Sequence, residues 1–260
     1  MKKLLLLSIT ALFLTLSLCA CNKIDTTKTD DYSSFYNKSS DIQAMEESPE
    51  DKKIDSVEYE ISRQDNSYRN QSGEILIENY YDQVILKGDS ESISLINSAI
   101  SNDMHKNFLK PEDMQNYAQH ATPEFAYMSN YTAEVTHNAN GYISIKMFTE
   151  WYMGGVHNSI WYGMTFNLNT GSHATLTELT GIDSKTLEFQ LKEKTWSYLT
   201  NERGDELFAE AYDTLQDYTL DKFNFSVENG EIILLFPVYT FAPGVSGSMT
   251  VPTGVYINAK

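Results

Sequence analysis

Hydrophobic and polar positions divide the chain into three stretches of different character. Residues 4–18 are mainly apolar, the polar stretch that follows has no steady period of 2 or 3.6, and residues 54–260 show regular alternation or helical spacing. A polar stretch without periodicity cannot bury enough apolar surface to offset the entropy of ordering its chain. The pattern therefore predicts a disordered tether with an acidic distal end over residues 21–53, followed by a folded part.

Strand signals dominate the folded part. Alternating or continuous apolar runs occur at residues 57–62, 73–86, 124–138, 141–154, 157–169, 221–243 and 248–258. The pairs Asn140-Gly141 and Asn229-Gly230 are typical of tight hairpin turns between such runs. We therefore expect residues 124–169 to form an antiparallel meander, with its second bend at Met153–Val156.

Helical spacing is clearest in residues 89–119. Four apolar residues fall three or four positions apart and predict one buried stripe: Ile93, Ile96, Ile100 and Met104. Ser90 is suited to begin this helix, and Pro111 is suited to open a second one, since proline fits a first helical turn.

Helices and strands together indicate an α+β fold. Two further helices are expected over residues 184–202 and 204–218. The meander is expected to pack against the helices, and the folded part to form two closely packed subdomains over residues 54–122 and 123–260.

The start of the chain predicts its compartment. Lys2 and Lys3 precede an apolar run that is shorter than the roughly 20 residues a spanning helix needs, as in a secretory signal peptide. The run ends in Leu18-Cys19-Ala20-Cys21, which resembles the bacterial lipobox. This predicts a signal peptide over residues 1–20, a lipid on Cys21 and an extracytoplasmic protein anchored to the bilayer; the alternative is an ordinary cleaved signal.

Charge and cysteine content restrict which partners the protein can attract and which cross-links can stabilise it. The formal net charge is −17, and removal of Lys2 and Lys3 leaves 17 basic against 36 acidic residues, a charge of −19. Such a surface repels nucleic acid and attracts cationic partners, although acidity can also serve solubility alone. The one cysteine left after cleavage is the lipidated one, so neither a disulfide nor a cysteine zinc site is expected.

The sequence contains no motif of a familiar catalytic or cofactor site. His-Glu-x-x-His, Gly-x-Ser-x-Gly, phosphate loops, dinucleotide fingerprints and calcium loops are all absent from it. We therefore expect no catalytic residue, no bound metal and no cofactor. A pair of catalytic carboxylates has no recognisable sequence motif, so glycosidase activity remains an open alternative.

Two separated motifs carry a family resemblance. Residues 151–179, "WYMGGVHNSIWYGMTFNLNTGSHATLTEL", and residues 225–247, "FSVENGEIILLFPVYTFAPGVSG", resemble an extracellular bacterial family classed as a domain of unknown function. This family occurs in the lysozyme-binding anti-sigma factor RsiV and in the non-catalytic region of the peptidoglycan deacetylase PdaC. The resemblance spans about residues 57–252 and implies an α+β fold whose second half is similar to part of the heat-shock ATPase fold. The spanning segment of the first and the deacetylase domain of the second are not expected here.

The same motifs supply the candidate site residues. Six residues are interpreted as structural turns, where positive φ or close backbone approach is needed: Gly154, Gly155, Asn169, Gly171, Asn229 and Gly230. Six others are interpreted as partner-binding: Tyr152, His157, Asn158, Pro237, Tyr239 and Pro243. A proline in a strand pattern predicts an edge or a break, and a tyrosine two positions on faces the same side. In the lysozyme-sensing relatives, this part is implied in the partner contact.

These observations favour a binding function. The first hypothesis is a membrane-anchored lipoprotein that recognises a cell-wall component, such as a peptidoglycan fragment, or a cationic wall-active protein such as lysozyme. A second hypothesis is a wall-glycan-modifying enzyme that uses His157 as base or ligand. A third is an accessory structural part of an envelope complex.

Overall fold

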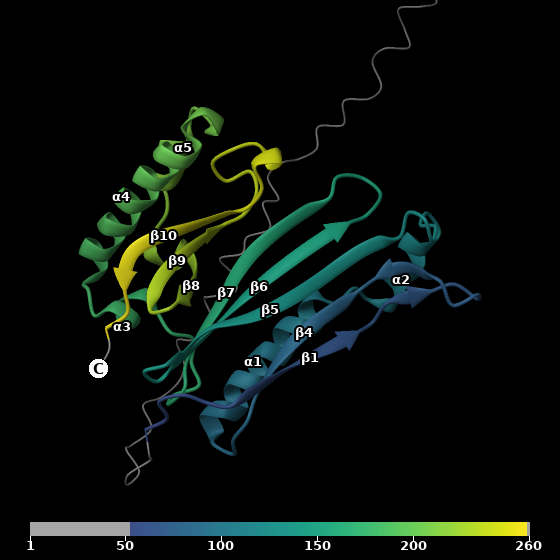
Figure 1. Cartoon of the computed structure of the whole chain (residues 1–260), viewed down its shortest axis with the longest axis horizontal. Helices are drawn as coiled ribbons and strands as arrows, with labels where there is room; N and C mark the ends of the chain where they lie inside the picture. Colours follow the sequence, from purple (N-terminus) through teal and green to yellow (C-terminus); the bar gives the residue numbers. More distant parts are fainter. Residues whose placement is uncertain (1–52, 259–260) are drawn as a thin grey trace, which may run out of the picture. The chain divides into compact units, whose positions relative to one another are not determined.

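A computed structural model describes residues 53–258, which form a mixed sheet of seven strands and a second sheet of three (Figure 1). The α+β fold class is confirmed. The predicted signal peptide, Cys21 and the predicted tether up to residue 52 lie outside the described residues. Within residues 53–258, no helix combines the length and the apolar character that crossing a membrane requires.

The predicted meander forms one side of the large sheet. Its strands are β5 (Tyr127–Ala139), β6 (Tyr142–Tyr152) and β7 (Asn158–Asn167). Neighbouring strands of this meander pair in antiparallel orientation. Asn140 and Gly141 both have positive φ, at 56° and 83°, which gives the tight turn that the Asn-Gly pair predicts.

Strands from the first part of the chain extend the same sheet. They are β1 (Tyr59–Asp65), β2 (Tyr68–Arg69), β3 (Ile75–Glu78) and β4 (Tyr80–Leu86). β3 and β4 both lie parallel to β5, and they are separated by the buried Asn79, whose Nδ2 donates to the Ser129 carbonyl at 2.8 Å. The predicted boundary between residues 122 and 123 separates β3 and β4 from β5, the strand with which they pair. The hydrophobic core changes later, between Leu168 and Ala174.

Helices connect β4 to β5 and cover one face of the sheet. They are α1 (Glu91–Asn107) and α2 (Pro111–Ala118). The Ser90 side chain accepts a hydrogen bond from the Ile93 amide and caps α1, and Pro111 occupies the first turn of α2. The predicted stripe of α1 is buried in the same core as β6 and β7. Asp103 of α1 also accepts hydrogen bonds from the phenols of Tyr81 and Tyr162, each at 2.7 Å.

The second part of the chain builds its own core around the small sheet. Its elements are α3 (Leu176–Thr180), α4 (Ser184–Arg203), α5 (Ala211–Gln216), β8 (Asn224–Glu228), β9 (Glu231–Phe236) and β10 (Met249–Tyr256). The helix predicted over residues 204–218 is correct only in part, since a 3-10 turn and α5 share that range. A continuous helix is excluded because the Phe208 amide donates to the Phe241 carbonyl at 2.8 Å.

Strand β8 lies against the large sheet on the face opposite α1. The Val227 amide donates to Ser144 Oγ at 2.9 Å, and Lys146 pairs with Glu228 at 2.7 Å. A Cβ on Gly163 would lie 1.9 Å from the Phe225 carbonyl oxygen, so the backbones meet directly. β8 therefore covers one part of this face, and the part of the face that carries Asn130 and Glu150 lies beyond it.

Candidate functional site

The bend between β6 and β7 contains the glycine pair. Gly154 has a φ of 83°, and a Cβ there would lie 2.6 Å from the Tyr127 hydroxyl, so this position requires glycine on two grounds. Gly155 meets neither condition: its φ is ordinary and a Cβ there would face open space. Tyr152 is half-buried, with its ring edge-on to Tyr127 at a centroid distance of 5.9 Å. The bend is confirmed, and the need for glycine holds for Gly154 alone of the pair.

His157 lies just before β7, as expected. Its Nε2 lies 3.3 Å from Glu150 Oε2 on β6, and 54 % of its side chain is exposed. Asn158 turns back and donates from Nδ2 to the Val156 carbonyl at 3.3 Å. Val156 itself is 69 % exposed, so the bend presents one apolar and one imidazole side chain to solvent.

The loop from Pro237 to Gly247 follows β9, and of the two predicted possibilities, an edge or a break, the structure shows the break. β9 is the central strand of the small sheet, and it ends at Phe236, so Pro237 terminates the strand instead of marking an edge. Tyr239 has a φ of 66°, so strand alternation does not set its direction. Pro243 precedes a 3-10 turn that contains the 94 % exposed Val245.

Tyr239 is held by close contact with Gly244. A Cβ on Gly244 would lie 2.3 Å from Tyr239 Cζ, so the ring lies directly over the glycine. Tyr239 nevertheless stays 59 % exposed. The loop is closed by Thr240, which donates from Oγ1 to the Pro237 carbonyl at 2.8 Å. The bend at residues 153–157 and this loop, together called the apical loops, both lie toward the top in Figure 1.

The remaining predicted turn residues have structural roles. Asn169 accepts from the Ile54 amide at 2.7 Å and donates to its carbonyl at 3.1 Å, which fixes the start of the folded chain. Gly171 has a φ of 75°, and a Cβ there would lie 2.8 Å from the Ser92 carbonyl of α1. Asn229 and Gly230, at 51° and 85°, form the β8–β9 turn.

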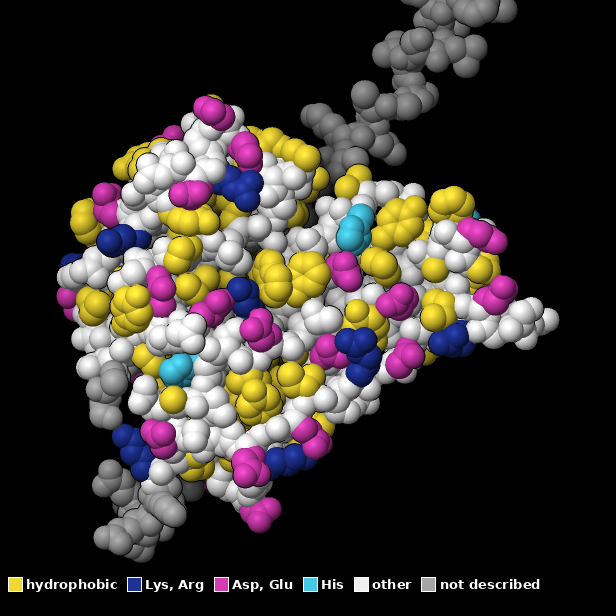
Figure 2. All heavy atoms as spheres, viewed as in Figure 1, with side chains coloured by type: hydrophobic (Ala, Val, Ile, Leu, Met, Phe, Trp, Pro, Cys, Tyr) yellow, Lys and Arg dark blue, Asp and Glu magenta, His cyan; other side chains and the backbone are white. Residues whose placement is uncertain are grey.

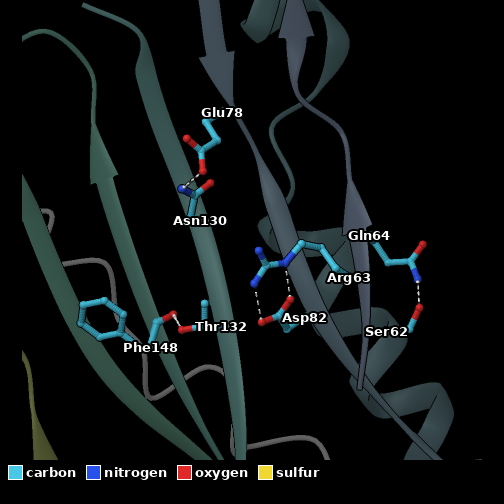
Figure 3. A network of polar contacts seen from close by, with 8 residues as sticks. All are labelled: Ser62, Arg63, Gln64, Glu78, Asp82, Asn130, Thr132 and Phe148. Atoms are coloured by element: carbon cyan, nitrogen blue, oxygen red, sulfur yellow. Dashed lines mark hydrogen bonds and ion pairs between the residues drawn. The ribbon is translucent and has the colours of Figure 1, made fainter. Parts of the chain in front are cut away.

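The sequence interpretation missed a row of polar side chains on the face opposite α1. Asn130 Nδ2 donates to Glu78 Oε1 at 3.0 Å (Figure 3). Asn130 is also paired across the strands with Glu150. These three residues, Glu78, Asn130 and Glu150, are called the acidic row. Alternation along β6 could have placed Glu150 on this face. Glu78 lies on β3, far away in the sequence, so no local pattern relates it to Asn130.

An aromatic row runs beside the acidic row. Thr132 is paired with Phe148, and Phe148 is paired with Trp161, with the two rings 4.6 Å apart. Lys146 Nζ lies 4.7 Å from the Trp161 ring centroid. Figure 2 shows hydrophobic side chains gathered over β5–β7 with charged side chains between them.

Charged groups and a phenol extend the acidic row toward β1. Arg63 forms a two-point ion pair with Asp82, at 2.7 and 3.0 Å (Figure 3). The Arg63 guanidinium also lies 3.9 Å from the Tyr80 ring centroid. Burial raises the pKa of the Tyr80 phenol, and Arg63 acts in the opposite direction. Glu78 and Glu150 raise that pKa further, which places both carboxylates within electrostatic reach of Tyr80.

The described residues contain no cluster of three or more His, Cys, Asp or Glu side chains suited to a metal ion. His137 and His173 have pKa values lowered by burial. His173 lies against the Phe166 ring at 4.4 Å, as in a packed core.

Comparison with solved structures finds a similar fold. A solved DUF3298 family protein from Bacteroides fragilis matches with a TM-score of 0.51 and 12 % identity, over 80 % of this chain and 96 % of its own. The chain has a DUF3298-like fold. A DUF3298 family protein from Pseudomonas aeruginosa matches with a TM-score of 0.47 and 12 % identity, over 79 % of this chain and 96 % of its own. No protein-family model and no curated protein matches the sequence.

Proposed function

We propose that the protein is a membrane-anchored, extracytoplasmic binding lipoprotein of the cell envelope. Its ligand in this proposal is a cell-wall component or a cationic wall-active protein such as lysozyme. The observation that carries the proposal is Tyr239, which is 59 % exposed although its backbone and ring are both fixed. An aromatic side chain that is already ordered loses little entropy on binding, which is typical of an interface anchor.

Three further features support this proposal. Val156 and Val245 expose apolar side chains in the apical loops beside a charge of −17 over the whole chain. Long-range attraction from that charge favours a basic partner, and the exposed side chains favour short-range contact. The leader sequence and Cys21 support the lipid anchor.

The test is titration of hen-type lysozyme against the full chain in neutral detergent, at low and high salt. We expect salt-dependent binding that Tyr239→Ala weakens by about tenfold or more, as for an interface hot spot. Tyr256→Ala is the matched control, because Tyr256 is also 59 % exposed but lies on β10. Absence of measurable binding at low salt rejects the lysozyme version of the proposal.

The anchor has a separate test. Cys21→Ala is expected to move the protein from the membrane fraction to the soluble fraction of cells, because it removes the lipidated thiol. Unchanged membrane association of this variant contradicts the anchor.

A second candidate is a wall-glycan-modifying enzyme, favoured by one contact. His157 Nε2 lies 3.3 Å from Glu150, and a carboxylate beside an imidazole can orient it as a general base. His157→Ala would then alter the muropeptide profile of cells, whereas the exposed control His120→Ala would not. A folded His157→Ala protein with an unchanged profile rejects this candidate.

A further inference from the structure

Within residues 53–258, the acidic row carries negative charge that no lysine or arginine neutralises through an ion pair. Each basic group nearby already has a partner: Arg63 is paired with Asp82, and Lys146 with Glu228. Glu78 accepts a hydrogen bond from the neutral amide of Asn130. Glu150 faces His157, which is charged only when protonated. Among residues 53–258, no lysine or arginine forms an ion pair with Glu78 or Glu150, so two carboxylates stay available to a cation.

Asn130 leaves an acceptor unused in the middle of this row. The residue is 2 % exposed, and its Oδ1 has no hydrogen-bond partner although its Nδ2 has one. A buried amide oxygen without a donor is unfavourable. It adds to the negative potential between Glu78 and Glu150, which a nearby cation would offset.

The rings beside the row already hold cations. Arg63 lies over the Tyr80 ring at 3.9 Å, and Lys146 lies over the Trp161 ring at 4.7 Å. An aromatic face attracts a guanidinium or an ammonium through its quadrupole. Since the chain's own cations occupy these ring faces, the carboxylates of the acidic row are the groups on this face that favour a cationic group over a neutral sugar.

The neighbouring edge of β7 favours a polypeptide as the carrier of that cation. The Gly163 amide donates to Asn224 Oδ1 at 2.8 Å, so it points away from β6. Because antiparallel pairs alternate, Trp161 and Ser159 also direct their backbone groups away from β6. The Thr165 carbonyl on the same side accepts from Ala174 at 2.9 Å, but within residues 53–258 no such bond covers Ser159 or Trp161. An extended segment could pair there.

We propose that the acidic row binds an arginine or lysine side chain of a protein partner whose extended segment lies along the open half of β7. The inference rests on the proposed binding function and names the chemistry that this face recognises. The two carboxylates would hold the cation, and the backbone groups of Ser159 and Trp161 would hold the segment that carries it.

The test compares two double variants of the full chain. Glu78→Gln/Glu150→Gln removes both charges and keeps the side-chain shape. Glu193→Gln/Glu202→Gln removes two exposed charges from α4 and is the matched control. The probes are hen-type lysozyme, a hexa-arginine peptide and a neutral N-acetylglucosamine tetramer, titrated at low and high salt.

We expect the row variant to bind the cationic probes about tenfold more weakly, with a smaller salt dependence, and the control to stay within about twofold. If lysozyme binds the parent and both variants equally, the inference fails while the proposed function stands. If only the peptide binds, and binds through the row, the inference stands and the lysozyme version fails. Loss of tetramer binding alone, or no binding of either cationic probe to the parent, overturns the inference.

Discussion

Packing of the two sheets at Gly163 allows a quantitative test by substitution. In Gly163→Ala the new Cβ would lie 1.9 Å from the Phe225 carbonyl oxygen and 2.6 Å from its carbonyl carbon. Both atoms belong to the backbone of β8, so no side chain can swing aside. Ordinary contact begins near 3.4 Å, so β8 would have to retreat by about 1.5 Å.

That retreat would disrupt the bonds that hold β8 to the large sheet. The Val227 amide would leave Ser144 Oγ, now at 2.9 Å, and the Gly163 amide would leave Asn224 Oδ1, now at 2.8 Å. Each lost hydrogen bond costs about 1 kcal/mol net, and overpacking adds about 1–3 kcal/mol. We therefore expect the free energy of unfolding to fall by about 3–5 kcal/mol, a large share of the 5–15 kcal/mol typical of a domain.

Urea unfolding, followed by tryptophan fluorescence and by far-ultraviolet circular dichroism, measures this change. Gly155→Ala is the matched control, because its Cβ would meet nothing within 4 Å and its φ is ordinary. The control should shift the free energy of unfolding by no more than about 0.5 kcal/mol. If Gly163→Ala proves as mild as Gly155→Ala, the direct backbone contact inferred here is refuted.

Two further predictions concern Asp103 and Gly244. Burial raises the pKa of Asp103 above its ordinary 3.8, so its contribution to stability is fully present below that value and is lost as pH rises through the raised pKa. As pH falls from 7, the free energy of unfolding of the parent should therefore increase relative to that of Asp103→Asn. A flat or opposite trend in urea titrations would contradict this. Gly244→Ala should displace the Tyr239 ring, because the new Cβ would lie 2.3 Å from Cζ. It should weaken lysozyme binding as Tyr239→Ala does while changing stability by less than about 1 kcal/mol, and unchanged affinity would count against the fixed ring.

Local signals in the sequence were sufficient to predict the buried face of α1 and the tight turn between β5 and β6. The stripe from Ile93 to Met104 is buried because helical spacing alone decides which side of α1 is apolar. Asn140-Gly141 forms the predicted turn because that pair tolerates positive φ at both positions. Each of these features depends on residues that are close together in the chain.

The pairing of strands that are distant in the sequence could not be predicted from local patterns. β3 and β4 join the large sheet through parallel pairing with β5, across two intervening helices. No pattern within residues 73–86 specifies that partner, so a boundary at residue 122 looked acceptable. At Pro237 the sequence left an edge and a break open, because the apolar run continues past it, and only the pairing of β9 on both sides shows that the strand ends at Phe236.

The acidic row depends on the same non-local register, and this is why individual residues did not reveal it. Phe148 and Glu150 could be assigned to one face from alternation along β6 alone. Alternation does not show, however, that Asn130 lies opposite Glu150. Nor does it show that Asn130 is hydrogen-bonded to Glu78, which lies 52 positions earlier in the sequence. Gly163 did carry a local signal, since an isolated glycine within a strand pattern indicates close backbone approach. That approach places β8 over one part of the face and leaves the carboxylates of the acidic row beyond it, so the residue that fixes the sheet packing also determines how much of this face β8 covers.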